Sequence, residues 1–193
     1  MKLEPYPNFE SFLQGVRRCA PLAIEWTGTI YRSAGLRYAN GRDLLSGAGS
    51  RRCGGRWNPP GAFAAVYGSL SPETAMAECL VHHRYFGIPV TRAMPRIFVG
   101  VQASLRRVLD LTSPRVLKAL RITAADLRSE DWRLANDQGR EALTQSLGRA
   151  AFAARWEGLL APSAWVAEAV NLAAFPANLQ GPSGLTAEGI SKR

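Results

Sequence analysis

Residues 54–78 read GGRWNPPGAFAAVYGSLSPETAMAE and place a glycine turn, a proline-rich loop, a short apolar run and a helix start one after another. The Gly54-Gly55 pair allows backbone angles that are closed to other residues, and residues 58–61 (NPPG) predict an extended segment followed by a turn. Arg56 and Trp57 therefore lie on a constrained loop. A guanidinium held in this way is suited to bind a phosphate.

A strand and a helix follow this loop. Residues 62–67 form an apolar run of strand length that ends at Tyr67, and Ser71-Pro72 is typical of a helix start, so we expect a helix over residues 73–85. Glu78 on this helix has mostly apolar neighbours in the sequence. Because a poorly solvated carboxylate needs a partner or a cationic ligand, Glu78 is a candidate site residue.

Each of these residues alone has an ordinary structural explanation. Taken singly, Glu78 is a solvated helix glutamate, Tyr67 is a core aromatic at a strand end, and Arg56 is a surface arginine. Their succession within one short stretch is what favours an active site.

Upstream, residues 8–20 predict a short amphipathic helix, and residues 25–33 predict the first strand. On that strand Arg32 shares a face with Ile30, which points the arginine towards the interior, where an anionic ligand is its natural partner. Residues 36–54 are rich in Gly, Ser, Arg and Asn, and the glycine content disfavours a stable helix. We expect a long loop there, which would act as a flap over the ligand.

Downstream of the Glu78 helix, short strands and helices follow. Ser163 comes after a proline, and it has no neighbouring His or Asp in the sequence that would make a hydrolase triad. We therefore assign Ser163 to ligand binding or to orienting Glu78. The expected strands cover residues 96–101 and 108–111, a further strand begins within residues 159–163, and residues 171–175 form a final short apolar piece. The expected helices cover residues 113–120 and most of residues 123–156.

Composition limits the class of protein. The chain has 193 residues, of which 47% are hydrophobic, so it fits one domain with a core of its own. Residues 179–193 are small and polar, and we expect them to form a flexible tail. The net charge of +9 and the sequence pI near 10.2 favour anionic partners, which include nucleic acid, a dinucleotide or an acidic protein.

Cysteine usage and hydropathy narrow the class further. The three cysteines, at positions 19, 53 and 79, suggest neither a disulfide framework nor a zinc site, so we expect no metal. This pattern fits the reducing cytoplasm. The chain has no apolar run of membrane-spanning length, and its N-terminus lacks the apolar core of a signal peptide.

Four segments of the chain resemble the RES domain family, the toxin half of bacterial RES–Xre toxin–antitoxin pairs. They are IYRSA at 30–34, LSGAGSRRCGGRWNPPG at 45–61, AVYGSLSPETAMAE at 65–78 and LLAPSAWVAEAVNLAAFP at 159–176, in the family order. Among these segments, GGRWNPPG together with YGSLSPETAMAE is specific for the family. The resemblance implies an α+β fold, with an ADP-ribosyltransferase-like core of two small mixed sheets flanked by helices, and a single RES domain over residues 1–178.

The resemblance also implies roles for individual residues. The family is named for an arginine, a glutamate and a serine, which match Arg32, Glu78 and Ser163, with Arg56 as the competing choice for the arginine. Tyr67 matches the tyrosine that families of this fold place beside a nicotinamide ring. The expected catalytic residues are Glu78, Arg32 and Tyr67, and those expected to bind the substrate NAD are Arg32, Arg56, Tyr67, Ser163 and Trp57.

The function implied is that of a cytoplasmic toxin that cleaves the nicotinamide–ribose bond of NAD, which depletes the cofactor and arrests growth. Its expected partner is an Xre-type antitoxin, through which nucleic acid would be contacted only indirectly, and a homo-oligomer in that complex is left open. One alternative is a mono-ADP-ribosyltransferase that modifies a protein, because the sequence does not identify the acceptor. A more distant alternative is an arginine-rich nucleic-acid-binding module.

Overall fold

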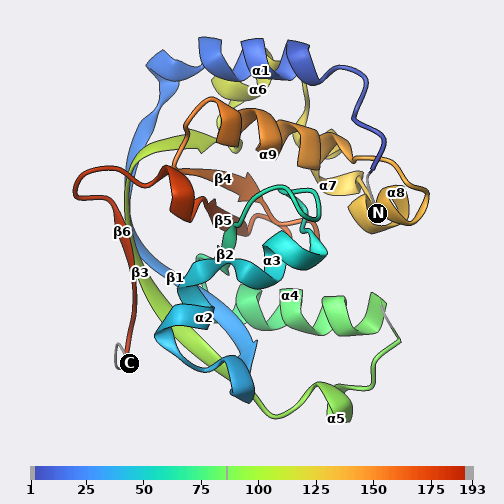
Figure 1. Ribbon diagram of the computed structural model, residues 1–193, viewed down its shortest axis with the longest axis vertical. Helices are drawn as coiled ribbons and strands as arrows, with labels where there is room; N and C mark the ends of the chain where they lie inside the picture. The colour runs from blue at the N-terminus through green and yellow to red at the C-terminus, as the bar shows by residue number, and fades with distance from the viewer. Residues whose placement is uncertain (1–2, 86, 190–193) are drawn as a thin grey trace.

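The structure, a computed structural model, describes residues 3–85 and 87–189. Within these residues, six strands form a mixed sheet flanked by helices, which confirms the expected α+β class (Figure 1). The strands are β1 (Ile24–Gly35), β2 (Val66–Ser69), β3 (Arg96–Asp110), β4 (Gly158–Pro162), β5 (Val170–Ala174) and β6 (Gly184–Ala187). The helices are α1 (Phe9–Arg18), α2 (Gly41–Ser46), α3 (Ala48–Cys53), α4 (Pro72–Tyr85), α5 (Val90–Ala93), α6 (Pro114–Leu120), α7 (Ala124–Ser129), α8 (Trp132–Asp137) and α9 (Leu143–Ala153), with 3₁₀ turns at Ala20–Leu22, Leu36–Tyr38 and Pro176–Asn178.

The sheet consists of two small halves that are joined at both ends. In one half, β1 runs antiparallel to β3 along its whole length, and β6 pairs with β3 as well. In the other half, β5 lies between β2 and β4 and is antiparallel to both. The halves meet where Tyr31 of β1 pairs with Ser69 of β2, and where β3 runs parallel to β4. The two expected sheets are therefore present as halves of one continuous, hydrogen-bonded sheet.

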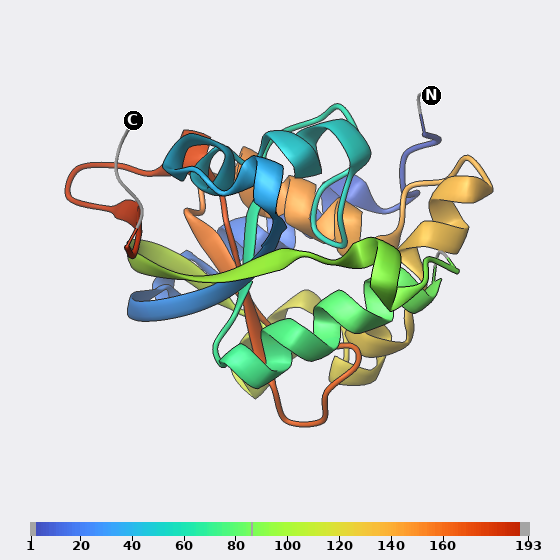
Figure 2. The same ribbon diagram turned by 90° about the horizontal axis from the view of Figure 1, so that it is seen from below.

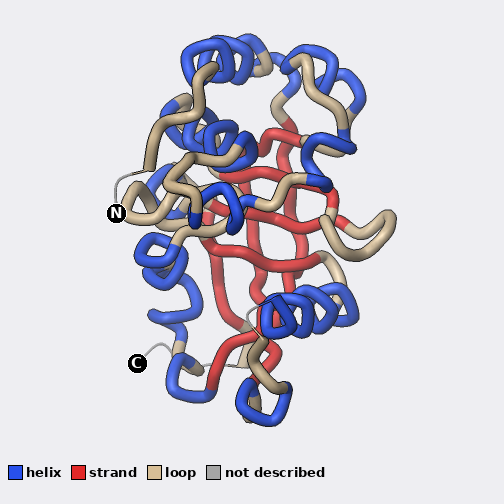
Figure 3. Tube along the Cα trace, turned by 90° about the vertical axis from the view of Figure 1, so that its right-hand side faces the viewer, coloured by secondary structure: helices blue, strands red, loops and turns tan. Residues whose placement is uncertain are grey.

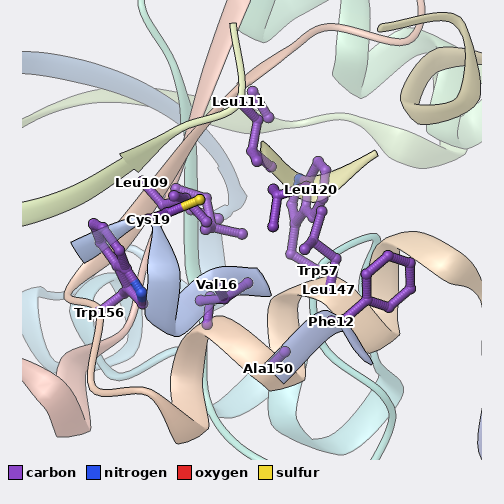
Figure 4. Packing of buried hydrophobic residues seen from close by; sticks show 14 of the residues in the cluster. Phe12, Val16, Cys19, Trp57, Leu109, Leu111, Leu120, Leu147, Ala150 and Trp156 are labelled. Carbon is purple, nitrogen blue, oxygen red and sulfur yellow. The ribbon is translucent and has the colours of Figure 1, made fainter. Parts of the chain in front are cut away.

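Helices lie on both sides of these strands. α1, α6 and α9 pack together at one end of the molecule, whereas α4 lies on the opposite side, against β1 and β2 (Figures 1 and 2). Figure 3 shows the strands as a bent layer between these groups of helices. The larger hydrophobic cluster includes Phe12 and Val16 of α1, Leu147 of α9, and the indoles of Trp57 and Trp156 (Figure 4). The loop that carries Trp57 is therefore anchored in the core.

Two strands differ in extent from those expected. The apolar run 62–67 was expected as a strand, but pairing begins only at Val66 and continues to Ser69. The expected strands 96–101 and 108–111 merge into the single strand β3, which ends at Asp110. Buried Ala103 and Leu105 alternate there with exposed polar residues, which is the period of two that a half-buried strand requires.

The segment 36–54, expected to be a long glycine-rich loop, contains two short helices instead. α2 begins after Asn40, whose Oδ1 accepts a hydrogen bond from the Asp43 backbone N–H at 2.9 Å, as a helix N-cap does. Gly47 separates α2 from α3 with a φ of 64°, and a Cβ atom at this position would lie 2.9 Å from the Ala65 backbone. Glycine at this position therefore joins two helices rather than preventing them.

The expectation of a flexible tail over residues 179–193 is wrong for residues 180–187. β6 extends the sheet by pairing with residues 101–104 of β3. Before it, the buried carboxylate of Glu157 accepts hydrogen bonds from the Gln180 backbone N–H at 3.1 Å and from the Ser183 hydroxyl at 2.8 Å. A small and polar segment is held here by strand pairing and by the Glu157 carboxylate, and residues 190–193 lie outside the described residues.

Among the helices of the described residues, none has the length and apolarity needed to cross a membrane.

The contact between α9 and the Trp57 loop gives a prediction for stability. A Cβ atom at buried Gly148 of α9 would lie 1.9 Å from the Trp57 carbonyl oxygen. Gly148→Ala should therefore lower the free energy of unfolding by about 2–3 kcal/mol or more, measured by urea denaturation. Gly49→Ala is the matched control, because nothing lies within 4 Å of that Cβ position. It should leave stability unchanged or raise it by up to about 1 kcal/mol, and equal losses in both variants would contradict the packing argument.

Candidate active site

A cleft of about 370 Å³ lies between α4, the ends of the central strands and the loop at residues 54–57. Residues from widely separated parts of the sequence form its walls. They include Tyr31, Arg32, Gly55, Arg56, Tyr67, Glu78, Cys79, Arg96, Trp132, Arg133, Trp165 and Asn171. The cleft therefore collects one carboxylate, several guanidinium groups and several aromatic rings.

Glu78 is held through one of its two carboxylate oxygens. The Ser163 hydroxyl donates a hydrogen bond to Glu78 Oε1 at 2.7 Å, and the Asn171 side-chain amide donates another to the same atom at 2.7 Å. Both donors come from the β4–β5 hairpin, whose turn lies beside α4 in Figure 2. Within residues 3–85 and 87–189, no hydrogen bond is made to Glu78 Oε2. This second oxygen is therefore left for a ligand.

The Ser163 hydroxyl uses its oxygen for two backbone N–H groups and its proton for Glu78. Its Oγ accepts hydrogen bonds from the backbone N–H groups of Trp165 at 3.2 Å and Val166 at 3.0 Å. A hydroxyl has one proton to donate, and here that proton goes to the carboxylate. Ser163 is only 2% exposed. Of the two roles expected for it, this geometry fits the orienting of Glu78 rather than direct contact with a ligand.

Arg56 and Arg133 bring positive charge to the Glu78 side of the cleft. Burial lowers the pKa of Arg56, and the nearby Glu78 carboxylate opposes that shift. The Arg56 Nη1 donates a hydrogen bond to the Leu127 carbonyl oxygen at 2.9 Å. Burial also lowers the pKa of Arg133, whose guanidinium lies 4.4 Å from the centre of the Trp132 ring. The carboxylate thus lies among cations that are partly withdrawn from water.

Arg32 carries a guanidinium that is buried without a matching acceptor. The residue as a whole is half-buried, but its Nε and Nη1 atoms have no contact with solvent and no hydrogen-bond partner among the described residues. Burial lowers the pKa of Arg32 to about 10. Because a buried donor without an acceptor is costly, an anionic ligand at this position would stabilise the arrangement.

Arg96 was not expected as a site residue, yet it lies in the same cleft. Its Nε donates to the Ser33 hydroxyl at 2.6 Å, and its Nη2 donates to the Ser33 carbonyl oxygen at 3.1 Å. The residue belongs to the start of β3, which pairs with the end of β1. Sequence patterns identify the strand but not this cross-strand contact, so only the pairing register could have predicted it.

The Tyr67 hydroxyl holds the loop at residues 54–58 in place. It accepts a hydrogen bond from the Trp57 backbone N–H at 2.9 Å and donates one to Asn58 Oδ1 at 2.6 Å. A Cβ atom at Gly55 would lie 2.6 Å from this hydroxyl, so the loop requires glycine there. Burial raises the pKa of Tyr67. The hydroxyl is therefore committed to the loop, while the residue still lines the cleft.

The structure brings most of the expected site residues together. Arg32, Arg56, Tyr67 and Glu78 all line one cleft, and Ser163 lies directly behind Glu78. Trp57 also borders this cleft, but its side chain is 3% exposed and belongs to the hydrophobic core (Figure 4). A ligand-binding role for the Trp57 side chain is not supported by this position.

Asn171 is a site residue that sequence reasoning missed. It stands in the otherwise apolar strand VNLAA, where its Oδ1 is buried without a partner among the described residues while its Nδ2 is bonded to Glu78. A polar side chain interrupting a buried strand was the available signal. Among residues 3–85 and 87–189, no three His, Cys, Asp or Glu side chains are grouped closely enough to hold a metal ion.

Comparison with known proteins places this cleft in a family. The RES domain family matches residues 29–187. The NAD(+) phosphorylase MbcT of Mycobacterium tuberculosis is 32% identical over 143 residues, which is 73% of this chain and 70% of that protein, and MbcT of Mycobacterium bovis matches equally. The Prs ADP-ribosylating toxin of a Sphingobium species is 44% identical over 57 residues, covering 30% of this chain and 35% of the toxin.

A solved structure agrees with the sequence relatives. A chain of the crystal structure of the M. tuberculosis MbcT–MbcA toxin–antitoxin complex superimposes with a TM-score of 0.74 at 29% sequence identity. The match covers 93% of this chain and 90% of that chain. The similarity therefore extends beyond the segments at the cleft to nearly the whole fold.

The Tyr67 hydroxyl can be tested through stability. Tyr67→Phe should lower the free energy of unfolding by about 1–3 kcal/mol near neutral pH, because the Trp57 N–H and Asn58 Oδ1 lose a buried partner. Since burial raises the Tyr67 pKa, the folded state keeps the phenol proton that the unfolded chain loses, and the difference between parent and variant should shrink as the pH rises above about 10. Tyr31→Phe is the control and should change little, because the Tyr31 hydroxyl makes no hydrogen bond within the described residues. A Tyr67→Phe protein as stable as the parent would contradict the assignment.

Arg32 and Arg96 form a matched pair for a second test. In the ligand-free protein, Arg32→Met should raise the free energy of unfolding by about 1–2 kcal/mol, because it removes buried guanidinium atoms that have no partner. Arg96→Met should lower it by about 1 kcal/mol, because two hydrogen bonds to Ser33 are lost. Urea denaturation of both variants measures the difference. If both substitutions destabilise the protein equally, Arg32 is not a site held ready for an anion.

Proposed function

The chain belongs to the RES domain family, and we propose that it is an NAD-degrading toxin of a toxin–antitoxin pair that cleaves the bond between nicotinamide and ribose. The observation that carries the proposal is the Glu78 carboxylate, held at Oε1 by Ser163 and Asn171 with Oε2 left for a ligand. The MbcT relatives are named NAD(+) phosphorylases, and one of them was solved in a toxin–antitoxin complex.

The chemistry of this bond needs a fixed negative charge. As nicotinamide leaves, positive charge develops on the ribose ring, as in glycoside cleavage. A carboxylate already oriented beside the ring stabilises that charge without reorganising during the reaction. Glu78 Oε2 takes this role in our proposal and also accepts a hydrogen bond from a ribose hydroxyl. Nicotinamide leaves as a neutral molecule, so no proton donor is required for its departure.

The remaining residues of the cleft hold the substrate. The Arg32 guanidinium, with buried nitrogen atoms that have no partner among the described residues, pairs with the pyrophosphate of NAD. The Tyr67 ring stacks on nicotinamide in our proposal. Its hydroxyl is already bonded to Trp57 and Asn58, so these contacts hold the ring in position for stacking. Arg56 adds positive charge beside Glu78.

We propose inorganic phosphate as the acceptor, following the printed name of the MbcT relatives. Phosphate would attack the anomeric carbon as the bond to nicotinamide breaks, which gives nicotinamide and an ADP-ribose that carries the phosphate. With water as the acceptor, the products would be nicotinamide, ADP-ribose and a proton. The cations around Glu78 support phosphate, because a second anion can approach there.

The partner that we propose is an Xre-type antitoxin that covers the cleft in the cytoplasm. The net charge of +9 favours an acidic segment in such a partner. Contact with nucleic acid would then occur through the antitoxin, and a complex with more than one toxin copy is compatible with this arrangement.

The test of the proposed chemistry is release of nicotinamide from NAD, followed by chromatography with and without phosphate. Glu78→Gln keeps the size of the side chain and removes its charge, so it should lower kcat by about a hundredfold to a thousandfold. Glu73→Gln, at an exposed position in the first turn of the same helix, is the matched control and should release nicotinamide at the parental rate. No release by the folded parent protein, even with phosphate and cell extract supplied, would overturn the proposal.

A second candidate, mono-ADP-ribosylation of a protein, is favoured by the similarity of part of the chain to the Prs ADP-ribosylating toxin. The same assay separates the two, using NAD labelled in the adenosine half. Label recovered as phosphorylated ADP-ribose supports phosphorolysis, whereas label retained on a protein supports transfer. A nucleic-acid-binding module would instead show affinity for DNA or RNA that falls steeply with salt, without any release of nicotinamide.

A further inference from the structure

The catalytic cleft contains a thiol that the proposed reaction does not use. Cys79 follows Glu78 on α4, lines the same cleft and is half-buried. The other two cysteines differ from it, because Cys19 is fully buried in the hydrophobic core (Figure 4) and Cys53 is exposed at the end of α3. A substituent on the Cys79 sulfur would therefore occupy space beside Glu78.

Two hydrogen-bonding groups face the Cys79 sulfur. The Ser33 hydroxyl donates to Sγ at 3.5 Å, and His83 Nδ1 lies 3.7 Å from Sγ. His83 Nδ1 also lies 2.7 Å from the Cys79 carbonyl oxygen, and because a carbonyl oxygen only accepts, we assign the proton to Nδ1. Both neighbours therefore offer a hydrogen to the sulfur, which suits the thiolate form in which a cysteine acts as a nucleophile.

Positive charge surrounds this thiol. Arg96 Nε donates to the Ser33 hydroxyl that contacts the sulfur. Arg32 lines the same cleft, and its Nε and Nη1 atoms are buried without a hydrogen-bond partner among the described residues. This second observation does not depend on the sulfur, and it points to an anionic ligand in the cleft. Reactive cysteines typically lie in such electropositive and partly exposed surroundings.

The space around the thiol is large enough for an attached group. A wider hollow of about 1060 Å³ adjoins the catalytic cleft, and both are lined by Ser33 and His83, the two residues that flank the sulfur. A substituent on Cys79 can therefore extend from the catalytic cleft into this hollow.

We infer that Cys79 is a thiolation site that regulates the cleft, and that it reacts with an anionic disulfide of low molecular weight. The Cys79 thiolate attacks one sulfur of the disulfide, so that a new sulfur–sulfur bond forms and the original one breaks. The departing thiolate takes up the proton that the Cys79 thiol released. The Cys79 sulfur is oxidised and the departing sulfur is reduced to the same extent, so the disulfide is the only co-reactant.

The attached group closes the cleft to substrate. Its sulfur is fixed next to Glu78, and its anionic groups pair with the buried Arg32 nitrogen atoms, where an anionic ligand would otherwise bind. The loss of activity that follows rests on the proposed cleavage of NAD, whereas the reaction of the thiol does not. A thiol reductant reverses the modification by the same exchange.

Treatment with glutathione disulfide tests the modification, with Cys53→Ser as the background so that the exposed cysteine does not react. Peptide mass spectrometry should find glutathione on Cys79 and none on Cys19. Nicotinamide release should fall in proportion to the labelled fraction and return with dithiothreitol. In the Cys79→Ser protein of the same background, treatment should leave the rate equal to that of its own untreated sample. No adduct on Cys79, an adduct with undiminished release, or an equal loss in Cys79→Ser would each overturn the inference.

The charge of the disulfide provides a second test. Glutathione disulfide is anionic and cystamine is cationic, and the ratio of their rates of reaction with Cys79 measures the preference for an anion. Arg32→Met should lower this ratio by about fivefold to tenfold, the effect of losing one charge-assisted contact. Arg115→Met, at an exposed position on α6, is the matched control and should leave the ratio unchanged. The same ratio in the parent and in Arg32→Met would overturn the assignment of an anionic disulfide.

Labelling also separates the inference from the proposed function. NAD added to the Glu78→Gln, Cys53→Ser protein should slow the reaction of Cys79 with glutathione disulfide, because substrate and adduct compete for one cleft. An unchanged rate at saturating NAD would overturn the closing of the cleft by the adduct. If the parent protein releases no nicotinamide but Cys79 is labelled with the Arg32-dependent preference, the proposed function fails and the thiolation site stands. If nicotinamide is released but Cys79 stays unlabelled, the proposed function stands and this inference fails.

Discussion

The Glu78 carboxylate is held by two hydrogen bonds to one oxygen, and the positions of the surrounding elements depend on this contact. The carboxylate comes from α4, which packs on β1 and β2, whereas both donors come from the β4–β5 hairpin. A hydrogen bond to a charged group contributes about 1.5–3 kcal/mol, so two of them tie the helix firmly to the hairpin. Because both act on Oε1, the free oxygen has a defined direction, which a carboxylate held by one donor would lack.

How much of this site the sequence predicts depends on whether each contact is local or joins residues that are distant in the sequence. The start of α4 at Pro72 and the position of Glu78 on it follow from local rules for helix starts, and the structure agrees with both. Whether Ser163 faces a ligand or Glu78 could not be decided locally, because its acceptor Glu78 comes from a helix that is distant in the sequence. Asn171 was missed for the same reason, since its partner lies on another element.

The errors in the fold have equally specific causes. Trp57 adjoins Arg56 on a constrained loop, but adjacency says nothing about which side of the loop is buried, and the Trp57 side chain belongs to the same hydrophobic cluster as Leu147 of α9. The polar segment after residue 179 lacks the apolar alternation of a strand, and its place at the edge of β3 rests on backbone pairing and on the Glu157 carboxylate, neither of which local patterns reveal. The roles of Arg32, Arg56 and Tyr67 in binding and catalysis stay predictions, because a position in the cleft does not demonstrate a role in the reaction.

The charges of the catalytic cleft fit the cleavage of a dinucleotide, which brings its own phosphate charges. Cleavage generates a positive charge on ribose, and a site lined by arginines would oppose that charge if their fields were uncompensated. NAD carries two phosphate charges, and these lie in our proposal beside Arg32, with Arg96 in the wall of the same cleft. The phosphates and these two arginines then largely neutralise each other. The Glu78 charge is then left to act on the ribose.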